Sequence, residues 1–129
     1  MPRADPRTLA AIALGGALGA PARYGLAQVI HVAPDSFPWA TFVTNVSGSF
    51  ALGVVLAVLL KRHPPPRYVR AFVATGFLGA YTTYSTFAVE TDLLVKDGHP
   101  LIAATYVVAS LLLGFSAAWA GIGAGQKIP

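Results

Sequence analysis

The chain has 129 residues, of which 55% are hydrophobic and 11% are charged, a balance that excludes an ordinary soluble domain and indicates one compact membrane protein. The sequence contains no cysteine, which excludes a disulfide framework, a thiolate metal site and a cysteine nucleophile. The net charge of +4 comes from basic residues in short loops beside apolar segments, as at the flanks of transmembrane helices, so no nucleic acid partner is expected.

Four apolar segments each approach or exceed the length of about 20 residues that crosses a bilayer. They span residues 8–30, 38–60, 69–94 and 100–122 and are separated by short stretches rich in Pro, Asp and Gly. The first resembles a signal peptide in its position, but its length favours a retained helix. Because no linker or strand alternation interrupts the pattern, we expect an all-α membrane protein in which residues 1–129 form a single four-helix transmembrane domain.

The basic residues indicate how these helices are oriented. Lys96 lies on one side of the expected membrane, Arg23 lies within the first segment, and seven basic residues lie on the side of both termini: Arg3, Arg7, Lys61, Arg62, Arg67, Arg70 and Lys127. By the positive-inside rule, this distribution predicts that both termini are cytoplasmic.

The first segment contains a pair of glycines and one buried-looking charge. Gly15 and Gly19 have the spacing that lets a second helix approach closely, so we interpret them as packing residues. Arg23 has two open interpretations: its guanidinium faces a cavity or a protein partner, or it extends along the helix to the membrane surface.

Polar residues form stripes on the second and fourth segments. Asn45 shares a helix face with Thr41 and Ser49, and Tyr106 and Ser110 are also four residues apart. An asparagine in such a helix either forms an interhelical hydrogen bond that holds the bundle together or offers its two N–H donors to an anion that has lost its water. Together with the third segment, these stripes predict a lined path through the bundle.

The third segment contains the most unusual stretch, residues 76–90. It combines two glycines and four aromatic residues with four residues that carry an aliphatic hydroxyl, which are Thr82, Thr83, Ser85 and Thr86. Such a polar interruption is tolerated in the bilayer only where protein or a water-filled cavity surrounds it. We therefore expect the functional centre here.

These segments resemble the small bacterial fluoride channels called CrcB or Fluc. The resemblance covers nearly the whole chain and is carried by residues 15–24, 41–50 and 76–87. The most specific part is the run Thr-Thr-aromatic-Ser-Thr-Phe that follows paired small residues in the third of four segments.

The resemblance implies an antiparallel dimer with two pores in the bacterial cytoplasmic (inner) membrane. It also implies a structural sodium ion at the dimer centre, held by backbone carbonyls where the third helix is broken in mid-membrane. The matching positions are Gly79 and Thr82. Unwinding at a glycine frees carbonyls that a hard cation can pair, whereas the alternative is a glycine kink satisfied by threonine hydroxyls without an ion.

The resemblance further implies an anion pathway along Asn45, Tyr84, Ser85, Thr86, Phe87, Tyr106 and Ser110. Aromatic ring edges are positive and can contact an anion without a formal charge that would trap it. Tyr84 departs from the family's phenylalanine, and Gly114 stands where the family has a serine. Arg23 corresponds to an arginine at the mouth of an aqueous vestibule, and Glu90 to an acid with a structural role.

The implied function is passive, selective export of fluoride that relieves fluoride toxicity, with no enzymatic chemistry. One alternative is a proton-coupled exporter of the small multidrug type, although its essential intramembrane acid is missing from the first segment. Another is a non-conducting structural subunit of a heterodimeric channel. Because the seven-to-one charge bias favours one orientation, we hypothesise a paralogous partner of opposite orientation, with a homodimer as the alternative.

Overall fold

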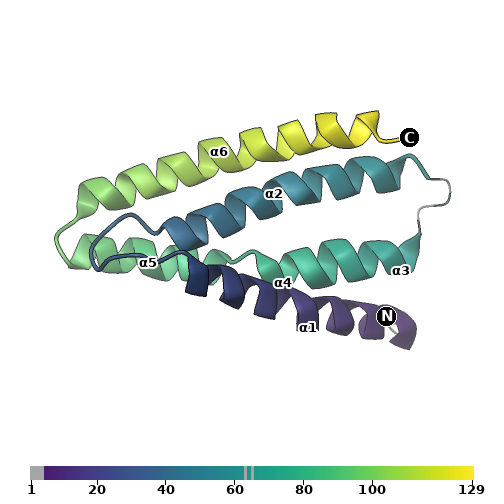
Figure 1. The fold of residues 1–129 in the computed structure, drawn as a ribbon, viewed down its shortest axis with the longest axis horizontal. Coiled ribbons are helices and arrows are strands. Elements are labelled where there is room, and N and C mark those ends of the chain that lie inside the picture. Colours follow the sequence, from purple (N-terminus) through teal and green to yellow (C-terminus); the bar gives the residue numbers. More distant parts are fainter. Residues whose placement is uncertain (1–4, 63, 65) are drawn as a thin grey trace.

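The computed structural model describes residues 5–62, 64 and 66–129, and this part of the chain forms helices joined by short loops, without strands. Four helical rods lie side by side (Figure 1). Three are single helices: α1 (Pro6–Val29), α2 (Trp39–Leu60) and α6 (Pro100–Lys127). The remaining rod consists of α3 (Arg67–Arg70), the π-helix η1 (Ala71–Leu78), α4 (Gly79–Tyr81) and α5 (Tyr84–Lys96). The expected all-α class is confirmed.

The last helix is longer than the sequence suggested. We expected its segment to end at residue 122, but α6 continues to Lys127. Its final turns pack closely on α2, and the Lys61 ammonium at the end of α2 donates to the carbonyl oxygens of Gln126 and Ile128, both at 2.6 Å. A lysine that satisfies terminal carbonyls stabilises a helix C-terminus, which explains the extension.

The third rod is interrupted at two threonines. After Tyr81 the backbone of Thr82 is extended, with φ −77° and ψ 160°, and Thr83 is extended at φ −148° and ψ 123°. Helix α5 then begins at Tyr84, and the Thr83 hydroxyl caps it by accepting a hydrogen bond from the amide of Thr86 at 3.2 Å. Only the single turn of α4 separates the interruption from the π-helix η1, an irregularity often found at functional sites.

Close contact between α1 and η1 places the first rod against this interruption. A Cβ at Gly15 would overlap the carbonyl oxygen of Phe72, and one at Gly19 would overlap the carbonyl oxygen of Phe77. Only glycine permits these approaches, so the expected packing role of the pair is confirmed.

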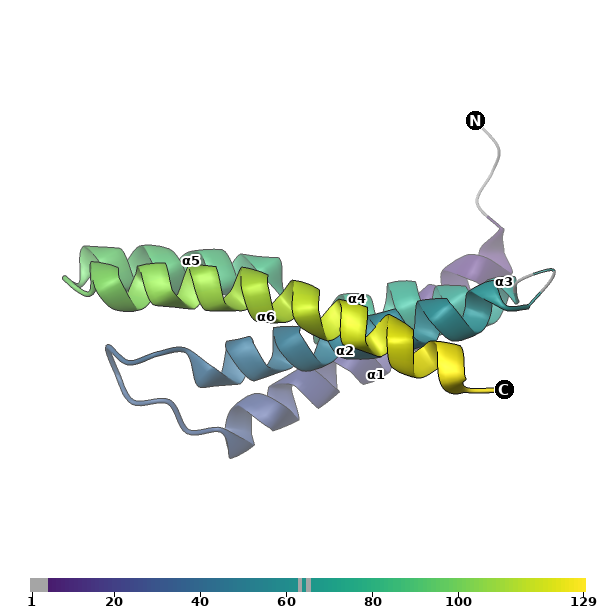
Figure 2. The ribbon, with the colours of Figure 1, turned by 90° about the horizontal axis from the view of Figure 1, so that it is seen from above.

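Both termini lie at the same end of the bundle, near α3 and the end of α2 (Figure 1). The basic residues Arg7, Lys61, Arg62, Arg67, Arg70 and Lys127 belong to segments at this end, while Lys96 lies at the opposite one. Arg3 lies outside the described residues. At the opposite end, α5 and the first half of α6 run together and diverge from the loop between α1 and α2 (Figure 2).

The outer surface is largely apolar. Large side chains such as Phe115 and Trp119 are 74% and 80% exposed. By length and composition, α2 and α6 are suited to cross a membrane. Together these features support a membrane protein whose exposed faces contact lipid or another subunit.

Candidate functional site

A pocket of about 380 Å³ opens beside the interruption in the third rod. It is lined by α2, by α6 and by both sides of the interruption. Its polar, glycine and aromatic lining residues include Asn45, Gly48, Ser49, Gly79, Thr82, Thr83, Tyr84, Phe87 and Ser110. Six of the residues proposed from the sequence therefore lie around one pocket: Asn45, Gly79, Thr82, Tyr84, Phe87 and Ser110.

Asn45 holds the interruption open. Its Oδ1 accepts a hydrogen bond from the backbone amide of Thr83 at 2.8 Å, and its Nδ2 donates to the carbonyl oxygen of Thr83 at 2.9 Å. The side chain thus provides the acceptor that the amide of Thr83 has lost with the break in the helix, and it adds a donor to the carbonyl. One N–H of the carboxamide is used in this way, which leaves the second as a donor at the pocket.

The interruption also frees backbone carbonyls. In a continuous helix the amide of Thr83 would bond the carbonyl of Gly79, but here that amide donates to Asn45. The carbonyl of Thr82 instead accepts a hydrogen bond from Nη1 of Arg23 at 3.3 Å. Of the two interpretations of Arg23, the structure supports a contact with another part of the same chain and not an extension to the membrane surface.

Two aromatic rings border the pocket from α5. The centroids of Tyr84 and Phe87 lie 6.1 Å apart with an interplanar angle of 41°. Phe87 packs in turn on Tyr106 at 5.0 Å, so its ring is held in place from behind. Tyr84 is 81% exposed and projects from the single chain.

The hydroxyl of Ser110 is a free donor at this pocket. Its Oγ is buried and makes no hydrogen bond within the part of the chain that the structure describes. A buried hydroxyl without a partner costs free energy unless a ligand or water satisfies it. Farther along α6, a Cβ at Gly114 would lie 3.8 Å from Oγ of Ser49, so a hydroxyl from α2 stands near the position of the family's serine.

Glu90 and Tyr106 belong to a separate polar cluster. The carboxylate of Glu90 accepts hydrogen bonds from the hydroxyls of Thr41 and Tyr106, each at 2.8 Å. Tyr106 is fully buried and its ring packs on Phe37 and Phe87. The structure therefore places Tyr106 outside the pocket, with its hydroxyl committed to Glu90.

A smaller pocket of about 220 Å³ lies on the other side of the interruption. Arg23, Thr41, Thr44, Thr83 and Thr86 are among its lining residues. Ser85 lines neither pocket; its Oγ lies 3.3 Å from Oγ1 of Thr83.

Thr83 borders both pockets and is the site residue that the sequence reasoning did not single out. The only signal for it in the sequence was its place among four hydroxyl residues, one of which had to cap the second half of the broken helix.

Comparison with known proteins gives concordant matches. Residues 10–122 match the family model described as CrcB-like protein, Camphor Resistance (CrcB). A fluoride-specific ion channel FluC 3 from Streptomyces avermitilis is 48% identical over 118 residues, covering 92% of this chain and 58% of that protein. A fluoride-specific ion channel FluC 1 from Mycobacterium tuberculosis is 44% identical over 117 residues, covering 91% of this chain and 89% of that protein.

A fluoride-specific ion channel FluC from Nitratidesulfovibrio vulgaris is 45% identical, covering 91% of this chain and 95% of that protein. The chain thus spans little more than half of the Streptomyces relative but most of the other two. All three names describe ion channels, so the expectation of a non-enzymatic protein is confirmed.

Proposed function

This chain belongs to the CrcB-like protein family, and on that premise we propose that it is a subunit of a fluoride-selective channel in a bacterial cytoplasmic membrane. Fluoride enters a cell as neutral HF and dissociates inside, so the anion accumulates until a pore releases it. Passive export down the electrochemical gradient would relieve this accumulation without any covalent chemistry.

The observation that carries the proposal is the buried, unpartnered hydroxyl of Ser110 beside the ring of Phe87 and the carboxamide of Asn45. These groups offer O–H, ring-edge C–H and N–H donors around one space, and none of the described residues that line it carries a formal charge. Donors replace part of the hydration shell of the anion, while the absence of a fixed positive charge allows the anion to leave. Conduction requires both properties.

The carbonyl oxygens of Gly79 and Thr82 would hold the structural sodium ion. Backbone carbonyls are suitable ligands for a hard cation, and the Gly79 carbonyl has lost its helical donor to Asn45. Since Arg23 already donates to the Thr82 carbonyl, we expect this arginine to tilt or move when a sodium ion binds at that oxygen.

We further propose an antiparallel dimer. Tyr84 and Gly79 are exposed on the single chain, where a second subunit would complete the site. Streptomyces avermitilis has at least two relatives, FluC 2 and FluC 3, so paired subunits within one organism are available in this family. The charge bias of this chain favours such a partner over a second copy.

Orientation can be measured directly because the chain lacks cysteine. We expect a cysteine introduced by Asp97→Cys, in the loop before α6, to react with a membrane-impermeant maleimide in intact cells. A cysteine introduced by Lys127→Cys should react only after permeabilisation. Equal labelling of the two positions from outside would show both orientations and would support a homodimer instead.

The channel itself is tested by fluoride release from liposomes. The protein is purified by a tag on this chain from the cells that naturally make it, so that any second subunit is retained. We expect Phe87→Ile to lower the release rate roughly fivefold. The substitution removes the contact between the ring edge and the anion, for which we take about 1 kcal/mol, the size of an aromatic edge contact. Phe115→Ile, which changes an exposed ring on α6, serves as the matched control. Equal rates for both variants would remove Phe87 from the pathway.

The alternatives predict other results in the same liposomes. A proton-coupled exporter would take up substrate in response to a pH gradient, and a purely structural subunit would release no anion. The fold disfavours the exporter because α1 carries no acidic residue and the carboxylate of Glu90 is already bonded by two hydroxyls.

A further inference from the structure

A second polar pocket lies at the end of the molecule that holds both termini. Its volume is about 340 Å³, and it lies between α1 and the start of the third rod. Its lining residues are Thr8, Ile12, Arg67, Arg70, Ala71 and Thr75. Two arginines and two threonines therefore border one space, and Ile12 and Ala71 form the apolar part of its lining.

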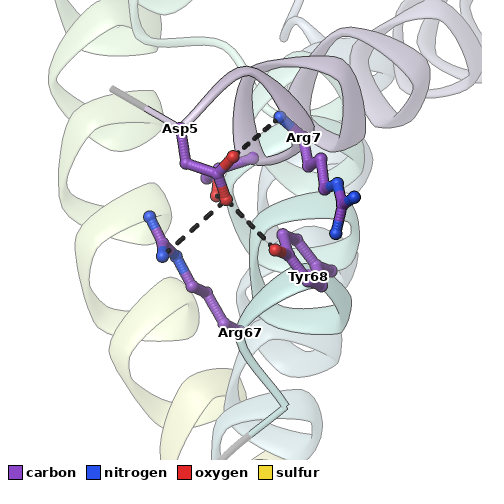
Figure 3. Close-up of polar contacts among 5 residues, drawn as sticks. Asp5, Arg7, Arg67 and Tyr68 are labelled. Atoms are coloured by element: carbon purple, nitrogen blue, oxygen red, sulfur yellow. Dashed lines mark hydrogen bonds and ion pairs between the residues drawn. The ribbon is translucent and has the colours of Figure 1, made fainter. Parts of the chain in front are cut away.

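The acidic residue nearest to this pocket, Asp5, is already bonded. Its carboxylate lies between the first turn of α1 and α3 (Figure 3). Its partners are the amide of Arg7 at 3.1 Å, the hydroxyls of Thr8 at 3.3 Å and Tyr68 at 3.1 Å, and the guanidinium of Arg67 at 3.8 Å. Within the described residues, Arg70 has no carboxylate at salt-bridge distance. The pocket thus keeps an excess of positive charge.

We propose that this pocket binds the phosphate group of an anionic phospholipid. Arginine forks and hydroxyls match the geometry of phosphate oxygens, and basic pockets between transmembrane helices on the cytoplasmic side bind anionic headgroups. The proposal depends on the chain spanning a membrane with this end at headgroup depth, and it does not depend on fluoride conduction.

The surroundings favour a lipid over free inorganic phosphate. The same two rods carry apolar side chains that are open to the outside, including Leu9 at 54% and Val69 at 48% exposure. A phospholipid would cover such surfaces with its acyl chains while its phosphate occupies the pocket. Free phosphate would gain only the polar contacts.

Native mass spectrometry of the purified protein tests this assignment, with equimolar phosphatidylglycerol and phosphatidylcholine added to the detergent. We expect retained phosphatidylglycerol in the unmodified protein and a loss in Arg67→Gln/Arg70→Gln of roughly fivefold in affinity per arginine. Arg67→Lys/Arg70→Lys should retain part of the binding because the charge remains. Arg62→Gln is the matched control, since Arg62 is a basic residue at the same end outside the pocket.

Three results would overturn the proposal: unchanged lipid retention in the double glutamine variant, an equal loss in Arg62→Gln, or displacement of the lipid by an equal concentration of inorganic phosphate. The last result would identify a free-phosphate site instead. Circular dichroism and gel filtration check folding, and Arg70→Gln alone replaces the double variant if that variant is unfolded. Fluoride release by the same proteins reports separately on the channel, so failure of either proposal is distinguishable.

Discussion

The pairing between Asn45 and the backbone of Thr83 gives the sharpest quantitative expectation. In Asn45→Ala the amide of Thr83 loses its acceptor at 2.8 Å, and its carbonyl loses a donor at 2.9 Å. The carbonyl of an N-cap residue keeps its intrahelical bond, so the main cost is one unsatisfied amide, about 1–3 kcal/mol. Asn45→Ser should cost a similar amount because its side chain is too short to reach both groups.

Asn45→Asp should be worse than either variant. A carboxylate keeps the acceptor for the amide but places a negative oxygen opposite the Thr83 carbonyl, where Nδ2 now donates. An ionised acid within a membrane helix costs roughly 3 kcal/mol, and the lost hydrogen bond to the carbonyl adds about 1 kcal/mol. We therefore expect the free energy of unfolding to fall by about 2 kcal/mol in the serine variant and about 4 kcal/mol in the aspartate variant.

The assay is reversible unfolding by sodium dodecyl sulfate in mixed micelles, followed by circular dichroism, with fluoride release measured in parallel. Ser116→Ala is the control, because the Ser116 hydroxyl bonds only the Leu112 carbonyl of its own helix, and it should change stability by less than about 0.5 kcal/mol. An aspartate variant that unfolds no more easily than the serine variant, and that releases fluoride as fast, would refute the role assigned to Asn45.

Further expectations concern packing, the carboxylate of Glu90, and pH. Gly121→Ala should destabilise the protein by about 1–3 kcal/mol because its Cβ would overlap the carbonyl oxygen of Phe50, whereas Gly123→Ala, which meets no atom within 4 Å, should be neutral or stabilising in the same unfolding assay. Glu90→Ala should be more destabilising than Glu90→Gln, since glutamine still accepts one of the two hydroxyl hydrogen bonds; equal losses would mean that packing alone matters. The hydrogen bond from a backbone amide lowers the pKa of Asp5 below 3.8, so its contribution to α1 is present above that value and is lost as the pH falls through the lower folded-state pKa. The protection factor for hydrogen exchange in the first turn of α1, which removes the intrinsic pH dependence of exchange, should fall in that range, and an unchanged protection factor would contradict the capping role.

The sequence was sufficient for the architecture because apolar segment length and loop composition are local properties. It placed four helical rods between the correct loops, and the resemblance placed the irregular part of the third rod near Gly79 and Thr82. It did not single out Thr83, the second of the two extended residues. Asn45, which is 38 residues away in the chain, holds Thr83 in its extended conformation. The pattern of hydroxyl residues alone does not indicate which of them is extended.

The same limitation applies to Arg23 and Tyr106. Whether Arg23 contacts the protein or the membrane surface depends on the rotation of α1 against η1, which the contacts at Gly15 and Gly19 determine in three dimensions. Tyr106 was assigned to the anion pathway with Ser110, four residues further along the same helix. In the structure the Tyr106 hydroxyl donates a hydrogen bond to Glu90, whereas Ser110 lines the pocket.

The central claim is that the pocket beside the interrupted helix belongs to a fluoride-selective pore. Its most direct test is the parallel measurement of fluoride and chloride release from liposomes that contain the channel purified through this chain. We expect rapid release of fluoride with chloride retained. Retention of both anions, or release of both at equal rates, would contradict the account.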